Sequence, residues 1–237
     1  MKFSIITVCY NSEKTIARTF ESVLNQTFQD YEYIVVDGAS TDGTLDIIKE
    51  YEPKFNGRMR YISEPDSGLY DAMNKGVRMS QGEIIGIINS DDYYEPDALQ
   101  QVISHFISGT DVYYGILRCV DENGEILLQR YHHSRLGKYP LQHPASFTCK
   151  KTYEKFGLFD LQYRIAADYD LFFRFLRGGA KFVPIDKVLT NFSSGGISDI
   201  TPAYEAFKVR FKYGIISRPR YWICLLVEFV RARILKW

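Results

Sequence analysis

Short apolar runs alternate with segments of helical spacing over the first ninety residues, and this alternation limits the fold more than any other feature of the chain. Four runs are typical of buried parallel strands, namely residues 3–9, 31–36, 60–62 and 83–88. Between them, apolar residues recur at helical spacing within residues 16–24, 45–48 and 69–79. This order predicts right-handed βαβ units, and hence an α/β, Rossmann-like fold with a mostly parallel sheet flanked by helices.

The pattern is less regular after Pro96. A helix is expected at residues 98–107, a hairpin from the runs 112–120 and 125–131, and a loop at 132–144. A further helix at 168–176 and a strand at 182–189 follow.

The composition is that of a globular chain. Of the 237 residues, 46% are hydrophobic and 24% are charged, and the formal net charge is zero, so no nucleic-acid partner is expected. No apolar run reaches the roughly 18 residues of a spanning helix, and a strand rather than a signal peptide is expected at the start. The four cysteines are far apart and lack metal-ligand spacing, which favours a reduced, cytoplasmic setting.

Two of the predicted strands end in carboxylates. Asp37 follows the second strand, and Asp91 and Asp92 follow the fourth, directly after Asn89 and Ser90. Because ligands bind where the carboxyl ends of parallel strands meet, we expect these side chains on one rim of the sheet. Such carboxylates suit Mg²⁺ or Mn²⁺, which take one or two of them and complete their shell with water and phosphate. Aspartate and asparagine also end strands as plain turn residues, and this alternative stays open.

The segment 64–76 is more polar than a plain loop and helix require. Lys75 is long enough to reach a phosphate, and three other side chains suit a ribose or a base: Asp66, Asp71 and Asn74. Alternatively, Asp66 caps the helix and Lys75 is solvated.

Two residues of the second half are candidates for chemistry. Asp168 stands at a predicted helix start, where a simple N-cap is the alternative role. His143 lies in a loop, where it either contacts an acceptor or has a structural role. Asp170 and Arg174 are four residues apart on the predicted helix, and we expect them to form a surface ion pair.

The end of the chain differs in charge from the rest. Residues 202–237 include eight basic and two acidic residues, mixed with aromatic and aliphatic ones. We therefore divide the chain into a domain of residues 1–200 and amphipathic, basic, aromatic-rich helices at 201–237. Basic amphipathic helices with aromatic residues lie in membrane interfaces and bind anionic lipid, which predicts peripheral membrane contact. Packing on the domain, or a dimer contact, is the alternative.

Six stretches in order resemble the inverting family 2 glycosyltransferases with a GT-A fold, especially bacterial enzymes that build O-antigen and other surface polysaccharides. They are I-I-T-V-C-Y-N-S (5–12), V-V-D-G-A-S-T-D-G-T (35–44), S-E-P-D-S-G-L-Y-D-A-M-N-K-G (63–76), N-S-D-D (89–92), Q-H-P-A (142–145) and A-A-D-Y-D-L (166–171). One such motif is a weak signal, whereas six in the expected order are specific.

On the donor side, the resemblance implies that Tyr10, Asn11 and Asp37 line a nucleotide pocket. It directs Asp37 and Asp66 toward the base or ribose. The sequence departs from the family's pattern at Gly38, where the family has a second aspartate after this strand.

On the reaction side, the resemblance implies that Asp91 binds the metal ion of a DxD-type motif, with Asp92 beside it near the donor. Asn89 stands where the motif has its first aspartate, which is the second departure. Asp168 matches the family's general base. His143 falls where residues that contact the acceptor occur.

The implied reaction moves a hexose with inversion, using Mn²⁺ or Mg²⁺, from UDP-glucose, UDP-galactose or their N-acetyl forms. The implied acceptor is a glycan carried on polyprenyl diphosphate at the inner face of the cytoplasmic membrane, in O-antigen or capsule synthesis. A sugar-nucleotide pyrophosphorylase would share the sheet and the cation, but the chain lacks a glycine-rich, arginine-bearing phosphate loop at its start. A non-catalytic carbohydrate-binding protein is the other alternative, and it would need no general base.

Overall fold

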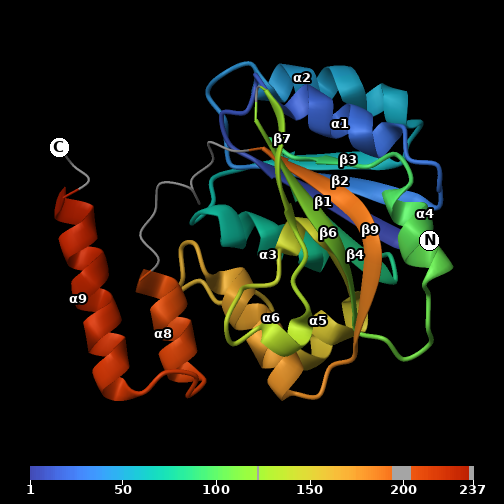
Figure 1. Ribbon diagram of the computed structural model, residues 1–237. Coiled ribbons are helices and arrows are strands. Elements are labelled where there is room, and N and C mark those ends of the chain that lie inside the picture. Colours follow the sequence, from blue (N-terminus) through green and yellow to red (C-terminus); the bar gives the residue numbers. More distant parts are fainter. Residues whose placement is uncertain (122, 194–203, 235–237) are drawn as a thin grey trace.

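The computed structural model describes residues 1–121, 123–193 and 204–234 of the chain. Within these ranges the strands join into a single mixed sheet (Figure 1). Its strands are β1 (Phe3–Cys9), β2 (Tyr31–Asp37), β3 (Met59–Ser63), β4 (Ile84–Asn89), β5 (Tyr93–Tyr94), β6 (Val112–Asp121), β7 (Gly124–Gln129), β8 (Ser146–Cys149) and β9 (Phe182–Ser193). The order is β3-β2-β1-β4-β8-β6-β9-β5, and β7 pairs with β6. The first four strands are mutually parallel, whereas β8 is antiparallel to both of its neighbours.

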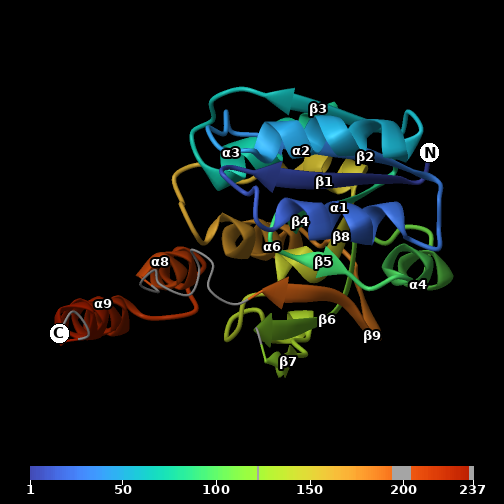
Figure 2. The same cartoon turned by 90° about the horizontal axis from the view of Figure 1, so that it is seen from above.

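Helices cover both faces of the sheet (Figures 1 and 2). One face carries α1 (Ile16–Leu24), α2 (Thr44–Tyr51) and α4 (Ala98–Ser104), and the other carries α3 (Leu69–Met79), α5 (Lys150–Phe156) and α6 (Ala167–Arg177). Short 3₁₀ turns lie at Glu52–Phe55, His133–Arg135 and His143–Ala145. Near the end of the chain, α8 (Tyr204–Lys212) packs against α6, and α9 (Arg218–Ile234) packs against α8.

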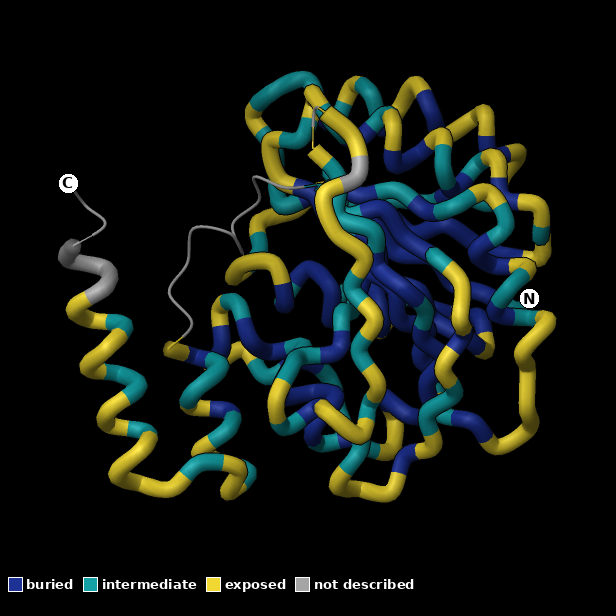
Figure 3. The backbone as a smooth tube through the Cα atoms, in the orientation of Figure 1, coloured by how far each residue is buried: buried dark blue, intermediate teal, exposed yellow. Residues whose placement is uncertain are grey.

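The two apolar cores follow from the alternation of side chains along the strands. In β1, Ile6 packs in one core with Met73 of α3, whereas Ile5 packs in the other core with Phe20 of α1. Each of the strands β1 and β2 is buried at every position, and the tube drawing shows this central buried layer (Figure 3). A sheet covered on both faces needs such continuous apolar runs, because neither face meets water.

The predicted fold class is confirmed. The four early strands lie where the apolar runs predicted them, and α3 has the predicted bounds. The hairpin is β6–β7, and α4 is shorter than expected because it ends at Ser104. β8 and α5 were not predicted: one has four residues, and the other is the polar segment K-K-T-Y-E-K-F.

The C-terminal helices behave differently from each other. The side chain of Val209 on α8 is fully buried against the α6 side of the domain. By contrast, α9 stands away from the sheet, beyond α8 (Figure 1). The boundary expected at residue 200 lies outside the described residues. Among the described helices, none is both long and apolar enough to span a membrane.

A buried carboxylate joins four strands at the edge where β1 and β2 begin. Glu32 accepts hydrogen bonds from the Ser4 hydroxyl (2.6 Å), from the Gln81 N–H (2.6 Å) and from Arg60 (2.8 Å). Burial raises the pKa of Glu32, but these donors outweigh burial, so that its pKa lies below the usual range. Ser4 lies in β1, Arg60 lies in β3 and Gln81 lies just before β4. Glu32, which lies in β2, therefore fixes the four strands relative to one another.

The depressed pKa of Glu32 predicts a pH-dependent stability. Its stabilisation is present above the unfolded-state pKa and is lost as pH falls through the lower folded-state pKa. Glu32→Gln is therefore expected to lower the free energy of unfolding at neutral pH by about 1–3 kcal/mol. The difference from the parent protein should shrink as pH falls below about 4. Urea unfolding of the parent protein and the variant at neutral pH and below pH ~4 measures this difference. An equal difference under the two conditions would contradict the stabilising role of the Glu32 charge.

Candidate active site

The strand register brings the predicted polar residues to one edge of the sheet. Cys9 at the end of β1 pairs with Asp37 at the end of β2, and Val8 pairs with Asn89 at the end of β4. Asp37 in turn pairs with Ser63 of β3. The loops after these strands therefore leave the sheet side by side, as predicted for a rim that binds a ligand.

Asp37 and Asn11 shape the loop after β2. Asp37 is fully buried, and its carboxylate accepts hydrogen bonds from Ser40 N–H and from the Ser40 and Ser63 hydroxyls. Asn11 has a left-handed backbone with φ of 50°, and its side-chain oxygen accepts the Thr41 N–H at 2.9 Å. In this structure both residues hold the loop in place, and the acceptor groups of Asp37 are used within the protein.

The departure at Gly38 has a steric explanation. A Cβ at this position would lie 2.6 Å from Oδ2 of Asp66 and 3.5 Å from the Tyr10 ring. The absence of a side chain therefore leaves room for the Asp66 carboxylate and the Tyr10 ring over Gly38. The Tyr10 side chain is 62% exposed, so one face of this group is open to a ligand.

The polar residues of α3 separate into two groups. Asp71 accepts the Ser67 N–H at 3.0 Å, and Lys75 binds Pro65 O at 2.8 Å and Glu64 at 2.9 Å, so both hold the loop before α3. Asn74 is buried, and it both donates to Phe159 O and accepts from Phe159 N–H, each at 2.9 Å. Its amide is satisfied by the backbone, and we no longer expect Asn74 to contact a donor.

The adjacent carboxylates Asp91 and Asp92 face different surroundings. Asp92 is fully buried and accepts Ser193 N–H at 3.0 Å and the Asn89 amide at 3.2 Å. Burial, and then the neighbouring Asp91, raise the pKa of Asp92 well above its usual range. Burial also raises the pKa of Asp91, while Arg18 and His143 act in the opposite direction. A nearby cation would favour the charged form of the Asp91 carboxylate.

The residues fit a divalent cation held by few protein ligands. Among the described residues, no group of three His, Cys, Asp or Glu side chains converges on one point. The side-chain oxygen of Asn89 is buried and has no partner there. A site with Asp91 as its carboxylate, completed by phosphate and water, matches the habit of Mg²⁺ and Mn²⁺.

Asp168 lies in the first turn of α6, facing two side chains from elsewhere in the chain. The N-cap of α6 is Ala166, so Asp168 does not act as the N-cap. Its Oδ1 accepts hydrogen bonds from the Tyr70 hydroxyl at 3.1 Å and from Tyr169 N–H at 2.8 Å. Its Oδ2 lies 3.5 Å from Nδ1 of His143, whose Nε2 is buried with no partner among the described residues.

Tyr70 and Arg18 were missed by the sequence reasoning. Burial, and then the charge of Asp168, raise the pKa of Tyr70 well above its usual range, so its hydroxyl stays a donor. Arg18 donates to Asp91 O and to the Ser193 hydroxyl, both at 2.7 Å. Tyr70 lies within one of the quoted motifs, but its helical spacing to Met73 and Val77 is that of a core residue. The position of Arg18 on α1 gave no such signal.

The expected ion pair of Asp170 and Arg174 is present, but its predicted place on the surface is wrong. Asp170 is fully buried, because α8 covers it, and its separation from Arg174 is 3.5 Å. Arg174 is nearer to two backbone oxygens, those of Phe156 (2.6 Å) and Leu158 (2.7 Å).

Most of the chain matches a known protein family. Residues 4–168 match the family model described as glycosyl transferase family 2. The chain belongs to glycosyl transferase family 2. The match begins in β1 and ends at Asp168, and thus includes the ends of β1, β2 and β4 and the first two residues of α6.

Curated relatives support this membership. Over 196 residues the chain is 31% identical to the chondroitin synthase of Pasteurella multocida (strain Pm70). The aligned region covers 79% of this chain and 20% of that protein. Over 176 residues it is 35% identical to the PGL/p-HBAD biosynthesis glycosyltransferase of Mycobacterium tuberculosis (strain ATCC 25177 / H37Ra), covering 71% and 67% respectively. The matched part is therefore about a fifth of the length of the chondroitin synthase.

Solved structures share the fold. The structure of S. aureus TarS 1–349 in complex with UDP-GlcNAc has a TM-score of 0.70 at 21% identity, covering 88% of this chain and 64% of that one. The mannosyltransferase PcManGT from Pyrobaculum calidifontis, in complex with GDP-Man and Mn²⁺, has a TM-score of 0.66 at 19% identity, covering 88% and 60%. These likenesses identify the fold as GT-A.

The contacts of Asn74 predict a structural role. Asn74→Ala is expected to lower the free energy of unfolding by about 2–4 kcal/mol, because it leaves two buried backbone groups of Phe159 unpaired. Lys75→Ala, the next residue on the same helix, should cost less than about 1 kcal/mol. Chemical unfolding of both variants measures the difference. Weakened nucleotide binding by Asn74→Ala at unchanged stability would show that it contacts a donor after all.

Proposed function

We propose that the chain is an inverting glycosyltransferase that moves a hexose from a nucleoside-diphosphate sugar to a glycan acceptor. The observation that carries the proposal is that His143 lies beside Asp168 and is within electrostatic range of Asp91. Asp168 is 3.5 Å from the His143 ring, and His143 acts electrostatically on Asp91. A single displacement needs a site for the leaving diphosphate beside a group that takes the acceptor's proton.

The donors that we propose are UDP-glucose, UDP-galactose or their N-acetyl forms. Family membership supports a sugar-nucleotide donor, and so do the complexes of TarS with UDP-GlcNAc and of PcManGT with GDP-Man. In this chain the exposed ring of Tyr10 offers an aromatic face to a base, next to the Asp66 carboxylate. Asp37 would contribute indirectly, because its carboxylate holds the loop after β2 in place.

A divalent cation, Mn²⁺ or Mg²⁺, would neutralise the charge that develops on the leaving diphosphate. We assign Asp91 as its protein ligand, with Asn89 beside it. Asp92 helps to position Asn89, since its carboxylate accepts hydrogen bonds from the Asn89 amide and from Ser193 N–H. Arg18 holds the backbone oxygen of Asp91 from the other side.

Asp168 is the proposed general base. An acceptor hydroxyl has a pKa far above 7, so its proton has to be removed during the attack on the sugar. The bonds from Tyr70 and Tyr169 both go to Oδ1, and they orient the carboxylate so that Oδ2 is directed toward His143. Attack from the side opposite the diphosphate inverts the anomeric centre, and His143 would contact the acceptor there.

Asp168→Asn tests the assignment of the base. The variant is expected to bind UDP and the donor as the parent protein does, but to lose at least about 100-fold in the rate of transfer, because the amide cannot take a proton. Asp186→Asn is the matched control, since Asp186 is an exposed residue of β9 that pairs with Arg130. Screening UDP- and GDP-sugars with and without Mn²⁺ provides the assay. Near-normal turnover by Asp168→Asn would refute the assignment.

For the acceptor we propose a polyprenyl-diphosphate-linked glycan of surface polysaccharide synthesis, reached from the inner face of the cytoplasmic membrane. The support is α9, whose large apolar side chains are exposed: Trp222, Ile223, Leu226, Val227, Phe229 and Val230. Arg218 and Arg220 are also exposed on its first turn. Exposed apolar and basic side chains on one helix suit the interface of an anionic bilayer.

The membrane contact is testable with vesicles. Replacing Trp222, Leu226 and Phe229 together by serine is expected to lower binding to vesicles that contain phosphatidylglycerol by at least about tenfold. Replacing the exposed Ile126 and Leu127 of β7 by serine is the control. Co-sedimentation measures both. Equal vesicle binding by the parent protein and the α9 variant would exclude α9 as the membrane contact.

A further inference from the structure

Helix α6, which carries Asp168, begins without a cap of its own. Its N-cap residue is Ala166, which makes no side-chain hydrogen bond to the helix. Backbone N–H groups that are shielded from water need a hydrogen-bond partner, and those of the residues leading into a helix find none within it. In this chain the N–H groups of three consecutive residues before α6 obtain their partner from α8.

That partner is the carboxylate of Glu205. It accepts hydrogen bonds from the N–H of Arg164 (3.0 Å), Ile165 (2.9 Å) and Ala166 (3.2 Å). Glu205 is only 5% exposed, so the carboxylate is shielded from water. A negative charge is favourable at this position, because all three N–H groups point toward it.

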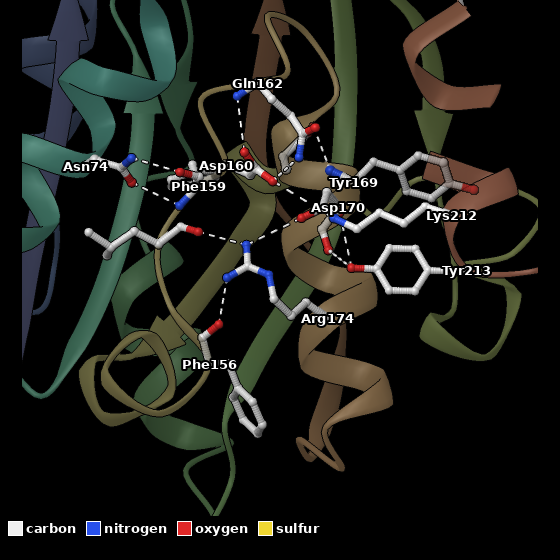
Figure 4. Close-up of polar contacts among 12 residues, drawn as sticks. Asn74, Phe156, Phe159, Asp160, Gln162, Tyr169, Asp170, Arg174, Lys212 and Tyr213 are labelled. Carbon is white, nitrogen blue, oxygen red and sulfur yellow. Dashed lines mark hydrogen bonds and ion pairs between the residues drawn. The ribbon is translucent and has the colours of Figure 1, made fainter. Parts of the chain in front are cut away.

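A second tie joins α8 to α6 on the other side of Asp168. The buried carboxylate of Asp170 accepts hydrogen bonds from Lys212 at 2.7 Å and from the Tyr213 hydroxyl at 3.1 Å (Figure 4). Arg174 approaches the same carboxylate from α6 itself. The close-up shows Lys212 and Tyr213 reaching Asp170 from the α8 side.

A third tie acts on the residue after Asp168. Arg210 of α8 donates to the Tyr169 hydroxyl at 3.1 Å and to Lys138 O at 2.8 Å. Ala166, Tyr169 and Asp170 are thus all held by α8, while Asp168 itself faces Tyr70 and His143. The contacts with α8 thus lie on both sides of Asp168 in the sequence.

We propose that Glu205 is a positioning residue for Asp168, and that α8 is a working part of the active site rather than an appendage. Glu205 fixes the backbone that enters α6, and the ties at Tyr169 and Asp170 fix the turn that follows. Together they keep the Asp168 carboxylate against Tyr70 and His143. The proposal rests on the proposed role of Asp168 as general base. It concerns a helix outside the residues that match the family model, which end at Asp168.

Glu205→Gln tests the proposal in the full-length chain. The amide keeps the size of the side chain but loses the charge and one acceptor, so the turn that carries Asp168 loosens. A displacement of about 1 Å at a reacting group costs up to roughly 100-fold in rate. We therefore expect kcat for transfer to fall by about 10- to 100-fold, while KM for the donor changes by less than about twofold.

Glu32→Gln is the matched control. Glu32 is also a buried glutamate that accepts backbone N–H groups, but it lies at the edge of the sheet away from the rim. Both variants should lose stability, and only Glu205→Gln should lose kcat. Hydrogen–deuterium exchange gives a readout that is independent of catalysis: residues 164–166 should exchange faster in Glu205→Gln and not in Glu32→Gln.

The outcomes separate this proposal from the assignment of the base. If Asp168→Asn is inactive and Glu205→Gln keeps the parent kcat, the positioning role is overturned while the base assignment stands. If Asp168→Asn is active, the base assignment itself fails. Should Glu205→Gln not fold, Arg210→Gln decides: a fall in kcat of about three- to tenfold with unchanged donor KM supports the proposal, and an unchanged kcat overturns it.

Discussion

The register of the parallel strands β1, β2 and β4 is the constraint on which the rest of the structure depends. It places the residues after Cys9, Asp37 and Asn89 at one edge, above an interior that is apolar on both faces of the sheet. Buried polar groups at such an edge have to pair with one another or with a ligand, because the apolar layer beneath offers them no partner. Glu32 secures the register from the opposite edge.

The two sides of the rim are built differently. On the side that we propose for the donor, the contacts are made by loops that directly follow the strands, as when Asp37 binds Ser40 and Asn11 binds Thr41. Around Asp168 the contacts join distant segments: Tyr70 comes from α3, His143 from a 3₁₀ turn and Asp168 from α6. Their meeting depends on the packing of α3 and α6 in one shared core.

The sequence predicted the parallel half of the sheet well, because strands buried on both faces need unbroken apolar runs that stand out from their surroundings. It missed β8 and α5, whose four and seven residues carry no comparable pattern. It also misjudged Asn74 and Asp170. Both were treated as solvent- or ligand-facing polar residues, and both are buried, because Phe159 and α8 bring hydrogen-bond partners from far along the chain.

Local pattern thus determined the βαβ order, the positions of the strand ends and the types of residue gathered there, since apolar periodicity and strand-end chemistry are properties of neighbouring residues. Only the tertiary structure decided which polar residues face the rim and which support it. It turned Asp92 inward, left Asp91 as the carboxylate that we propose for a cation, and brought Glu205 against the backbone that leads into α6. Such choices depend on which distant segments pack together, and that packing is set by the whole core.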